Sequence, residues 1–255
     1  MCIRDSIGTM ALAIEGMLLP AISNLHSNRK DKEITTLVHD AERYVAMVCI
    51  PLVAMTIVWS SEIILVFISK EFLSASNILK ILALVALVRV LNRPWSVALR
   101  GSDRPDLTSI LSIFSSILSI ILMLILVPKR IPQLGLENLF GLGGEGAAYA
   151  VLISEILVGI SLRILCYKYL NILPKANFLV QIFVATLVGL IMWQVQETIT
   201  VDRWFELLFL SGLGGLLFLS ILSMIGSFNQ KDFNFFWNTL NPKSMKQYVG
   251  EELKR

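Results

Sequence analysis

Two arginines stand inside an otherwise apolar stretch, and they are the residues whose chemistry most needs explaining. Residues 78–105 read ILKILALVALVRVLNRPWSVALRGSDRP, with Arg89 and Arg93 in the second half of a run long enough to cross a membrane. An isolated arginine at bilayer depth costs at least ~2.5 kcal/mol, so its side chain must meet protein, water or an anionic ligand. The chemistry on offer is therefore electrostatic attraction of an anion.

Helical spacing places these cations on one side of the stretch. Arg89 and Arg93 are four residues apart and share a helix face, to which Arg100 returns closely. Pro94 lacks an N–H group and crowds the preceding turn, which predicts a kink. We interpret the stretch as a bent helix whose cationic stripe faces a cavity. Alternatively, Arg93 and Arg100 extend to the membrane interface; this suits Arg89 less, because about 16 Å of helix separate it from Arg100.

Acidic side chains in or beside the apolar blocks could balance these charges. Glu62 and Glu145 are expected near the outer interface, where water solvates them, whereas Glu15 and Glu155 lie deeper. Either of the deeper two could pair with Arg89 or titrate as a proton site. Pairing is favoured for Glu155, because unpaired charges do not persist at that depth.

Other constellations that carry chemistry are absent from the sequence. His26 and His39 share a polar loop and are interpreted as solvated histidines, not metal ligands. There is no Walker loop for a nucleotide, and the three cysteines show no motif spacing. We therefore expect no enzyme activity, no catalytic residues, no cofactor and no metal.

The composition indicates an all-α polytopic membrane protein. Hydrophobic residues make up 55% of the 255-residue chain and charged residues only 16%, whereas a soluble domain has about 25% charged residues. The apolar residues gather in blocks of about 20, the length that crosses the hydrocarbon core. The net charge of +3 is too small to suggest nucleic acid as a partner.

The chain divides into six complete spans after one partial span. The complete spans are expected at residues 44–68, 72–99, 107–127, 144–166, 178–195 and 205–225. The full division is a non-native leader (1–6), the end of a truncated helix (7–23), a cytoplasmic loop or surface helix (24–43), a six-helix bundle (44–226) and a cytoplasmic tail (227–255). Because the leader fits nothing that follows, we expect the native N-terminal part to be missing.

Basic residues predict the orientation of these spans. Fifteen Lys and Arg residues fall on one side of the predicted spans and four on the other. Cytoplasmic loops carry the excess of positive charge in membrane proteins. The first side, with the C-terminus, is therefore predicted to face the cytoplasm. The membrane is expected to be the inner (cytoplasmic) membrane of a cell.

Several short segments, in their order, resemble one transporter family. Leu18-Leu19-Pro20-Ala21-Ile22-Ser23 is followed by Arg43 and then by Ile50-Pro51-Leu52. A turn at residues 99–106 reads LRGSDRPD, and residues 142–150 read LGGEGAAYA. This order is similar to that of the polysaccharide flippases of the multidrug/oligosaccharidyl-lipid/polysaccharide exporter superfamily. The external turn departs from the family pattern, with Ile68-Ser69-Lys70 where Tyr/Phe-Gly is usual.

The resemblance implies that this chain forms the second helical bundle of a two-bundle flippase. The first bundle would then be the missing partner of this chain. Such proteins move polyprenyl pyrophosphate-linked glycans across the cytoplasmic membrane by alternating access, for surface polysaccharides such as O-antigen. Their cavities are often cationic, which would map to Arg89 and Arg93, with Glu15 or Glu155 as charge partner or proton site. Lipid-linked oligosaccharide and membrane lipids are the expected partners.

Two other functions stay open. An ion-coupled multidrug antiporter of the same superfamily would favour acidic groups in its cavity, and an absent first half could hold them. A membrane component of envelope biogenesis that does not transport would need a polar cluster at one interface, and the sequence shows none.

Overall fold

The computed structural model describes residue 16 and residues 18–131, 136–137, 139–173, 177–199, 201 and 203–228. Residues 18–27 are helical. The predictions for the leader, for Glu15 and for nearly all of the tail lie outside the described residues.

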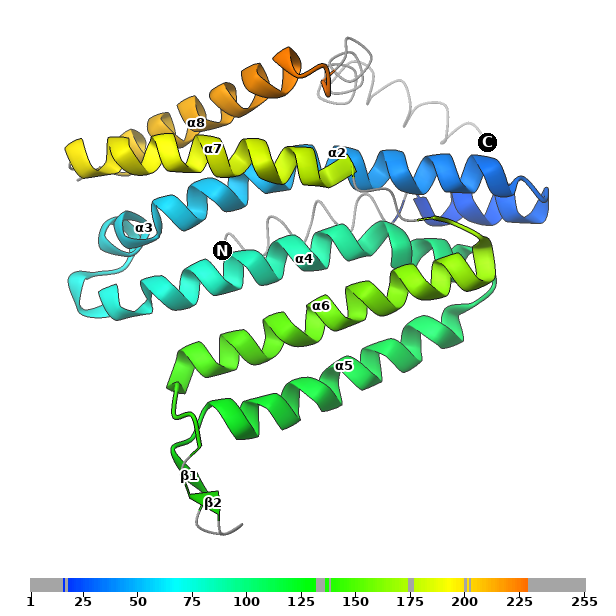
Figure 1. Ribbon diagram of the computed structural model, residues 1–255, viewed down its shortest axis with the longest axis horizontal. Helices are drawn as coiled ribbons and strands as arrows, with labels where there is room; N and C mark the ends of the chain where they lie inside the picture. Colours follow the sequence, from blue (N-terminus) through cyan, green and yellow to red (C-terminus); the bar gives the residue numbers. More distant parts are fainter. Residues whose placement is uncertain are drawn as a thin grey trace, which may run out of the picture.

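The described chain is a set of long helices with one short hairpin (Figure 1). The elements are α2 (Asp31–Val58), α3 (Ser60–Phe67), the 3₁₀ helix η1 (Lys70–Ala75), α4 (Ser76–Gly101), α5 (Pro105–Leu126), β1 (Arg130–Ile131), β2 (Leu136–Glu137), α6 (Gly143–Leu170), α7 (Asn177–Thr198) and α8 (Trp204–Met224). β1 and β2 pair antiparallel, with Arg130 opposite Glu137.

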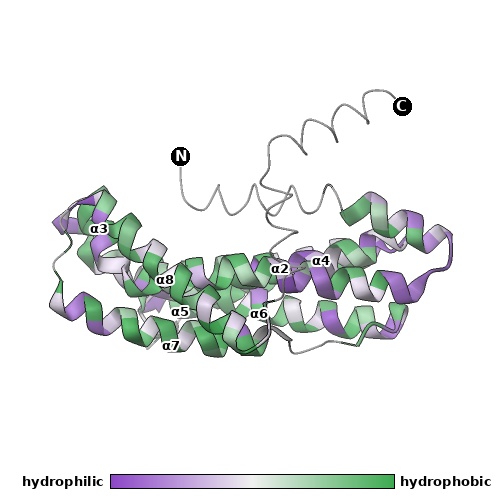
Figure 2. Cartoon of the chain, turned by 90° about the horizontal axis from the view of Figure 1, so that it is seen from above, coloured by the Kyte–Doolittle hydropathy of each residue, from purple (hydrophilic) through white to green (hydrophobic). Residues whose placement is uncertain are grey.

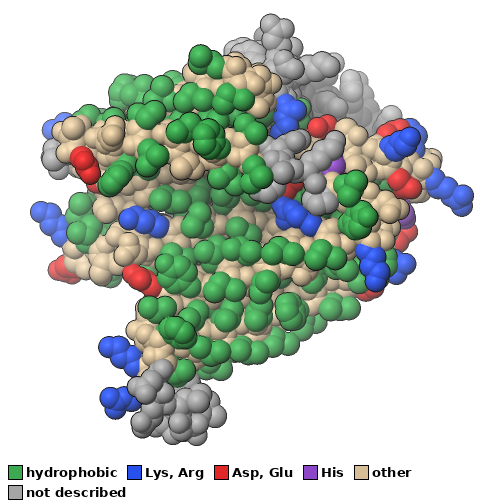
Figure 3. All heavy atoms as spheres, in the orientation of Figure 1, with side chains coloured by type: hydrophobic (Ala, Val, Ile, Leu, Met, Phe, Trp, Pro, Cys, Tyr) green, Lys and Arg blue, Asp and Glu red, His purple; other side chains and the backbone are tan. Residues whose placement is uncertain are grey.

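The long helices run side by side, and successive ones point in opposite directions (Figure 1). α2, α7 and α8 form one group and α4, α6 and α5 another, and α4 lies between α2 and α6. Within the described residues, six helices are long and apolar enough to cross a membrane. Green residues dominate their length in Figure 2, and Lys and Arg gather mostly at the two ends of the face in Figure 3. The predicted all-α fold with six spans is therefore confirmed.

The first spanning helix differs from its prediction at both ends. α2 begins at Asp31 and runs without a break past residue 43, where a separate loop or surface helix was expected to end. Ile34, Val38 and Val45 are all buried, so one apolar face continues across the predicted boundary. At the other end Trp59 leaves the helical path, and the remaining part of the predicted span is a separate helix, α3.

Local chemistry explains where several helices begin and end. Pro105 is the first residue of α5, where a missing N–H costs nothing, and Asp106 in the first turn complements the helix dipole. α6 ends at Asn171, whose left-handed conformation (φ 53°) closes the last turn. α4 runs through Pro94 without interruption.

Two apolar clusters hold the helices together. One surrounds Trp59 and Phe218 and joins α2, α4, α7 and α8; the other surrounds Trp95 and Leu99. Small residues permit close approach at the start of α6, where a Cβ on Gly146 would lie 2.6 Å from the Leu126 carbonyl oxygen. By contrast, a Cβ on Gly212 would meet nothing within 4 Å.

This contrast predicts the effect of one substitution at two sites. Gly146→Val should lower the free energy of unfolding by about 1–3 kcal/mol, because the backbone of α5 must move away. Gly212→Val should change it little. Thermal unfolding of the detergent-solubilised variants measures both, and equal midpoints would contradict the close α5–α6 contact.

Candidate functional site

Arg89 and Glu155 face each other between α4 and α6. The Nε–H of Arg89 donates to Oε1 of Glu155 over 2.7 Å. The Arg89 side chain is 52% exposed and that of Glu155 17%. The cation in the middle of α4 thus meets a carboxylate and still reaches open space.

That open space is a polar cavity of about 320 Å³ between α4, α5 and α6. The lining side chains are Arg89, Ser112, Ser115, Ser116, Ser119, Val151, Ser154, Glu155 and Val158. The four α5 serines recur at helical spacing and form a hydroxyl stripe on one face. The hydroxyls of Ser112 and Ser116 donate to carbonyl oxygens one turn back on α5, which leaves their oxygens free to accept a ligand hydrogen bond.

The other face of α5 is apolar and exposed, with Ile110, Ile113, Phe114 and Ile117 each at least half accessible. This contrast between two faces of one spanning helix is the pattern expected where lipid lies on one side and a wet surface on the other.

The remaining predicted site residues lie elsewhere. Arg93 and Arg100 are half-buried, have interactions of their own, and are not among the side chains that line this cavity. Glu145 accepts a hydrogen bond from Asn77 at 3.3 Å, and Glu62 accepts one from Gln196 at 2.8 Å.

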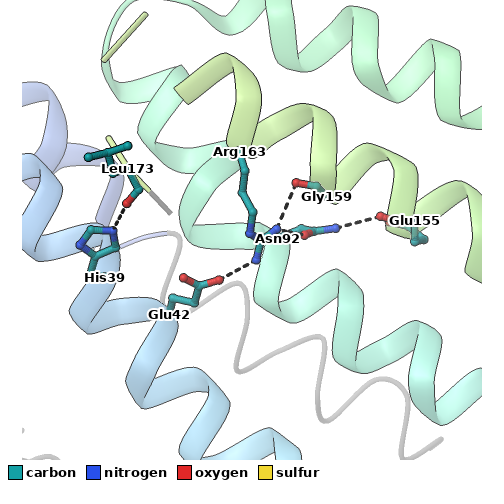
Figure 4. A network of polar contacts seen from close by, with 7 residues as sticks. All are labelled: His39, Glu42, Asn92, Glu155, Gly159, Arg163 and Leu173. Atoms are coloured by element: carbon teal, nitrogen blue, oxygen red, sulfur yellow. Dashed lines mark hydrogen bonds and ion pairs between the residues drawn. The ribbon is translucent and has the colours of Figure 1, made fainter. Parts of the chain in front are cut away.

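A second, more buried polar network lies further along the same helices (Figure 4). Arg163 of α6 donates through Nη2 to Oε1 of Glu42 on α2 over 2.6 Å. Its Nη1 donates to Oδ1 of Asn92 at 3.0 Å and to the carbonyl of Gly159 at 3.1 Å. The side chains of Arg163 and Glu42 are only 20% and 5% exposed.

Aromatic contacts complete the surroundings of this ion pair. The Arg163 guanidinium lies 5.2 Å from the ring centre of Trp95, which is fully buried. His39 packs edge-on against the same ring, and its Nε2 is 2.9 Å from the carbonyl oxygen of Leu173. The prediction of a solvated loop histidine is therefore wrong for His39, which lies on the buried face of α2.

Sequence reasoning missed this second network. It placed Arg163 near the end of the predicted span 144–166 and counted it with the basic residues of one side, and it placed Glu42 in the segment 24–43, whereas α6 continues seven residues beyond Arg163. A usable signal was the apolar sequence on both sides of Arg163, which is the same signal that identified Arg89.

The ion pair predicts a large stability effect. Glu42→Ala should lower the free energy of unfolding by about 3–5 kcal/mol, because it leaves the buried guanidinium without its carboxylate. The matched control is Glu33→Ala, which removes an exposed pair with Lys30 at 2.9 Å and should cost under about 1 kcal/mol. Denaturant unfolding of both variants in detergent measures the difference, and similar midpoints would show that the pair is not desolvated.

Comparisons with known proteins agree with this fold. The MatE family matches residues 4–125. A search of curated proteins finds no match. Among solved structures, the lipid II flippase MurJ in an inward closed conformation superposes with a TM-score of 0.62 and 22% identity, over 85% of this chain and 44% of that one. The chain thus spans less than half the length of that flippase and shares its fold. The MatE match covers just under half of this chain and the structural match shows the fold, so membership of the multidrug/oligosaccharidyl-lipid/polysaccharide exporter superfamily stays a prediction from the sequence.

Proposed function

We propose that this chain takes part in moving a lipid-linked oligosaccharide across the cytoplasmic membrane, by alternating access. The observation that carries the proposal is Arg89, a half-exposed cation in a hydroxyl-lined cavity between membrane-spanning helices. The fold shared with a lipid II flippase supports it, because the name of that protein gives a lipid as the molecule it flips.

The geometry of Arg89 suits a pyrophosphate head group. Its Nε–H is used by Glu155, and Arg89 makes no further hydrogen bond to the described residues. A guanidinium presents five N–H donors, so its two terminal nitrogens are left to bind two phosphate oxygens together. The neighbouring serine hydroxyls add donors and acceptors of the kind that sugar hydroxyls require.

Glu155 has a balancing role in this proposal. Without a carboxylate at 2.7 Å, an empty cavity would hold an uncompensated cation among spanning helices. With it, an arriving anion competes for Arg89, so the substrate is held but also released. Release matters as much as capture, because a carrier that binds one state too tightly does not turn over.

The wider arrangement belongs to the proposal as well. The basic side of the spans, with the C-terminus, faces the cytoplasm. A second bundle rocks against this one, with the cavity at their interface, as in transporters built from paired repeats. Arg93 would then lie on the route of the head group and not in the cavity itself.

A multidrug antiporter is the second candidate, and the carboxylate of Glu155 in the same cavity is what favours it. A cationic drug would pair with Glu155 and be repelled by Arg89. Cells that express the protein would then accumulate less of a cationic dye, and this loss would disappear in Glu155→Gln.

Substitution of Arg89 tests the flippase directly. Arg89→Ala should lower export of surface polysaccharide by about 10-fold or more, since hydrogen bonds to charged groups contribute about 1.5–3 kcal/mol. Arg89→Lys should retain part of the activity, because lysine keeps the charge but loses the paired donors. The readout is polysaccharide at the surface of cells in which the native gene carries each variant.

The matched control is Arg130→Ala, which removes an exposed arginine in the hairpin outside the cavity and should leave export unchanged. Export at the wild-type level in both Arg89 variants would exclude Arg89 from the mechanism.

A further inference from the structure

The two ion pairs are joined by one uncharged side chain, that of Asn92. Its Nδ2–H donates to the carbonyl oxygen of Glu155 at 3.1 Å, and its Oδ1 accepts from Nη1 of Arg163 at 3.0 Å. Asn92 is 6% exposed, so these bonds have little competition from water. A continuous path of polar contacts therefore runs from the cavity to the buried pair (Figure 4).

Helical spacing puts these residues along one seam. Glu155, Gly159 and Arg163 are four residues apart on α6 and share a face. Arg89 and Asn92 are three apart on α4 and also share a face. A slip of one helix past the other by a single turn, 5.4 Å, would separate Arg89 from Glu155. Asn92 lies one turn away from that pair, where it opposes such a slip.

Gly159 is the residue that makes room for Asn92. A Cβ at position 159 would lie 2.5 Å from Oδ1 and 2.9 Å from Nδ2 of Asn92. The obstacle is a buried amide of α4 that makes two hydrogen bonds to α6, not the end of a flexible chain. Any side chain at this position must therefore displace Asn92 from the seam.

The seam is also tied to a third helix. α4 lies between α2 and α6, and Arg163 extends from α6 to reach Glu42 on α2. The guanidinium thus holds Asn92 from one side and is itself held by a carboxylate that is 5% exposed.

We propose that Asn92 is a positioning residue for the cavity. It holds Glu155 in place against the anchor formed by Arg163 and Glu42, and through Glu155 it also holds Arg89. In this proposal Asn92 does not contact the substrate. It determines the positions of the charged side chains of Arg89 and Glu155 in the cavity. The proposal rests on the proposed function for its consequence in transport, but its structural content concerns the potential in the cavity and can be tested without any substrate.

The test is a pair of charged thiol reagents in the cavity. Ser116→Cys places a thiol in the cavity lining, where an anionic and a cationic methanethiosulfonate react at rates whose ratio reports the local potential. The experiment uses the purified chain in nanodiscs, and protein without Ser116→Cys gives the background from native cysteines. Removing the charge in Arg89→Gln should lower the anion-to-cation ratio at least about fivefold, because the cation lies in a partly desolvated site.

The neutral variants Asn92→Ala and Gly159→Ala should each lower the anion-to-cation rate ratio as well. The change in the logarithm of the ratio should be at least half of the change that Arg89→Gln causes. Each variant should change the ratio less when Arg89→Gln is already present, since residues that act as a unit are not additive. The matched control is Gly189→Ala on α7, where a Cβ would meet only Val58 Cγ2 at 3.9 Å, and it should leave the ratio unchanged.

The outcomes separate the two proposals. A purely structural role would lower thermal stability in Asn92→Ala and Gly159→Ala but leave the ratio at the wild-type value, and this would overturn the inference. If Asn92→Ala does not fold, Gly159→Ala alone decides. A shifted ratio in a protein whose Arg89 variants export normally would uphold the positioning role and reject the proposed function.

Discussion

A charge cannot stand alone among membrane-spanning helices, and this constraint organises the molecule. Two arginines lie well inside long apolar helices, and each meets a carboxylate on a different helix, at 2.7 Å for Arg89 and 2.6 Å for Arg163. An unpaired cation at that depth would cost several kcal/mol, so these contacts select the relative positions of α2, α4 and α6 more sharply than apolar packing alone. Two apolar helix faces can shift along each other at a small cost in free energy, whereas an ion pair is lost when its two side chains are moved apart.

The two pairs are alike in chemistry and differ in exposure, and the difference assigns their roles. Glu42 and Arg163 are 5% and 20% exposed, and the Arg163 guanidinium lies over the ring of a buried tryptophan, so no ligand can replace either partner. Arg89 is 52% exposed beside a hydroxyl-lined cavity, so an incoming anion can compete for it. In the proposed function, one pair therefore serves as an anchor, and the other is the part of the network that responds to a ligand. A transport site needs both a fixed ion pair and an accessible one, because an accessible charge binds a ligand reproducibly only when the helices around it stay in position.

Much of the fold was predictable because the bilayer imposes a length on each element. Blocks of about 20 apolar residues predicted six spans, and the part of the chain that the structure describes holds six helices of suitable length. The same reasoning singled out Arg89 and Glu155. It failed for Arg163, Glu42 and Asn92, because 121 residues separate Arg163 from Glu42, and Arg163 was counted with the basic side while Glu42 was assigned to a polar segment. Nothing local to Gly159 indicates that an amide 67 positions earlier requires its missing Cβ. The serine stripe on α5 is periodic in the sequence, but the sequence does not reveal that this face of α5 lines a cavity with α6.

Asn92 illustrates why an uncharged residue belongs between the two pairs. The position needs a donor for a main-chain carbonyl on one side and an acceptor for a guanidinium on the other. An aspartate would accept from Arg163 but could not donate to Glu155, and it would add a third buried charge. A serine could do both in principle, but its single oxygen could not span two partners held on different turns of α6. The amide satisfies both sides without changing the net charge of the seam, so each arginine keeps one carboxylate. Among the side chains that line the cavity, the charged ones are then Arg89 and Glu155. In the proposed function, a small shift of α4 against α6 would therefore change how strongly an anion is held.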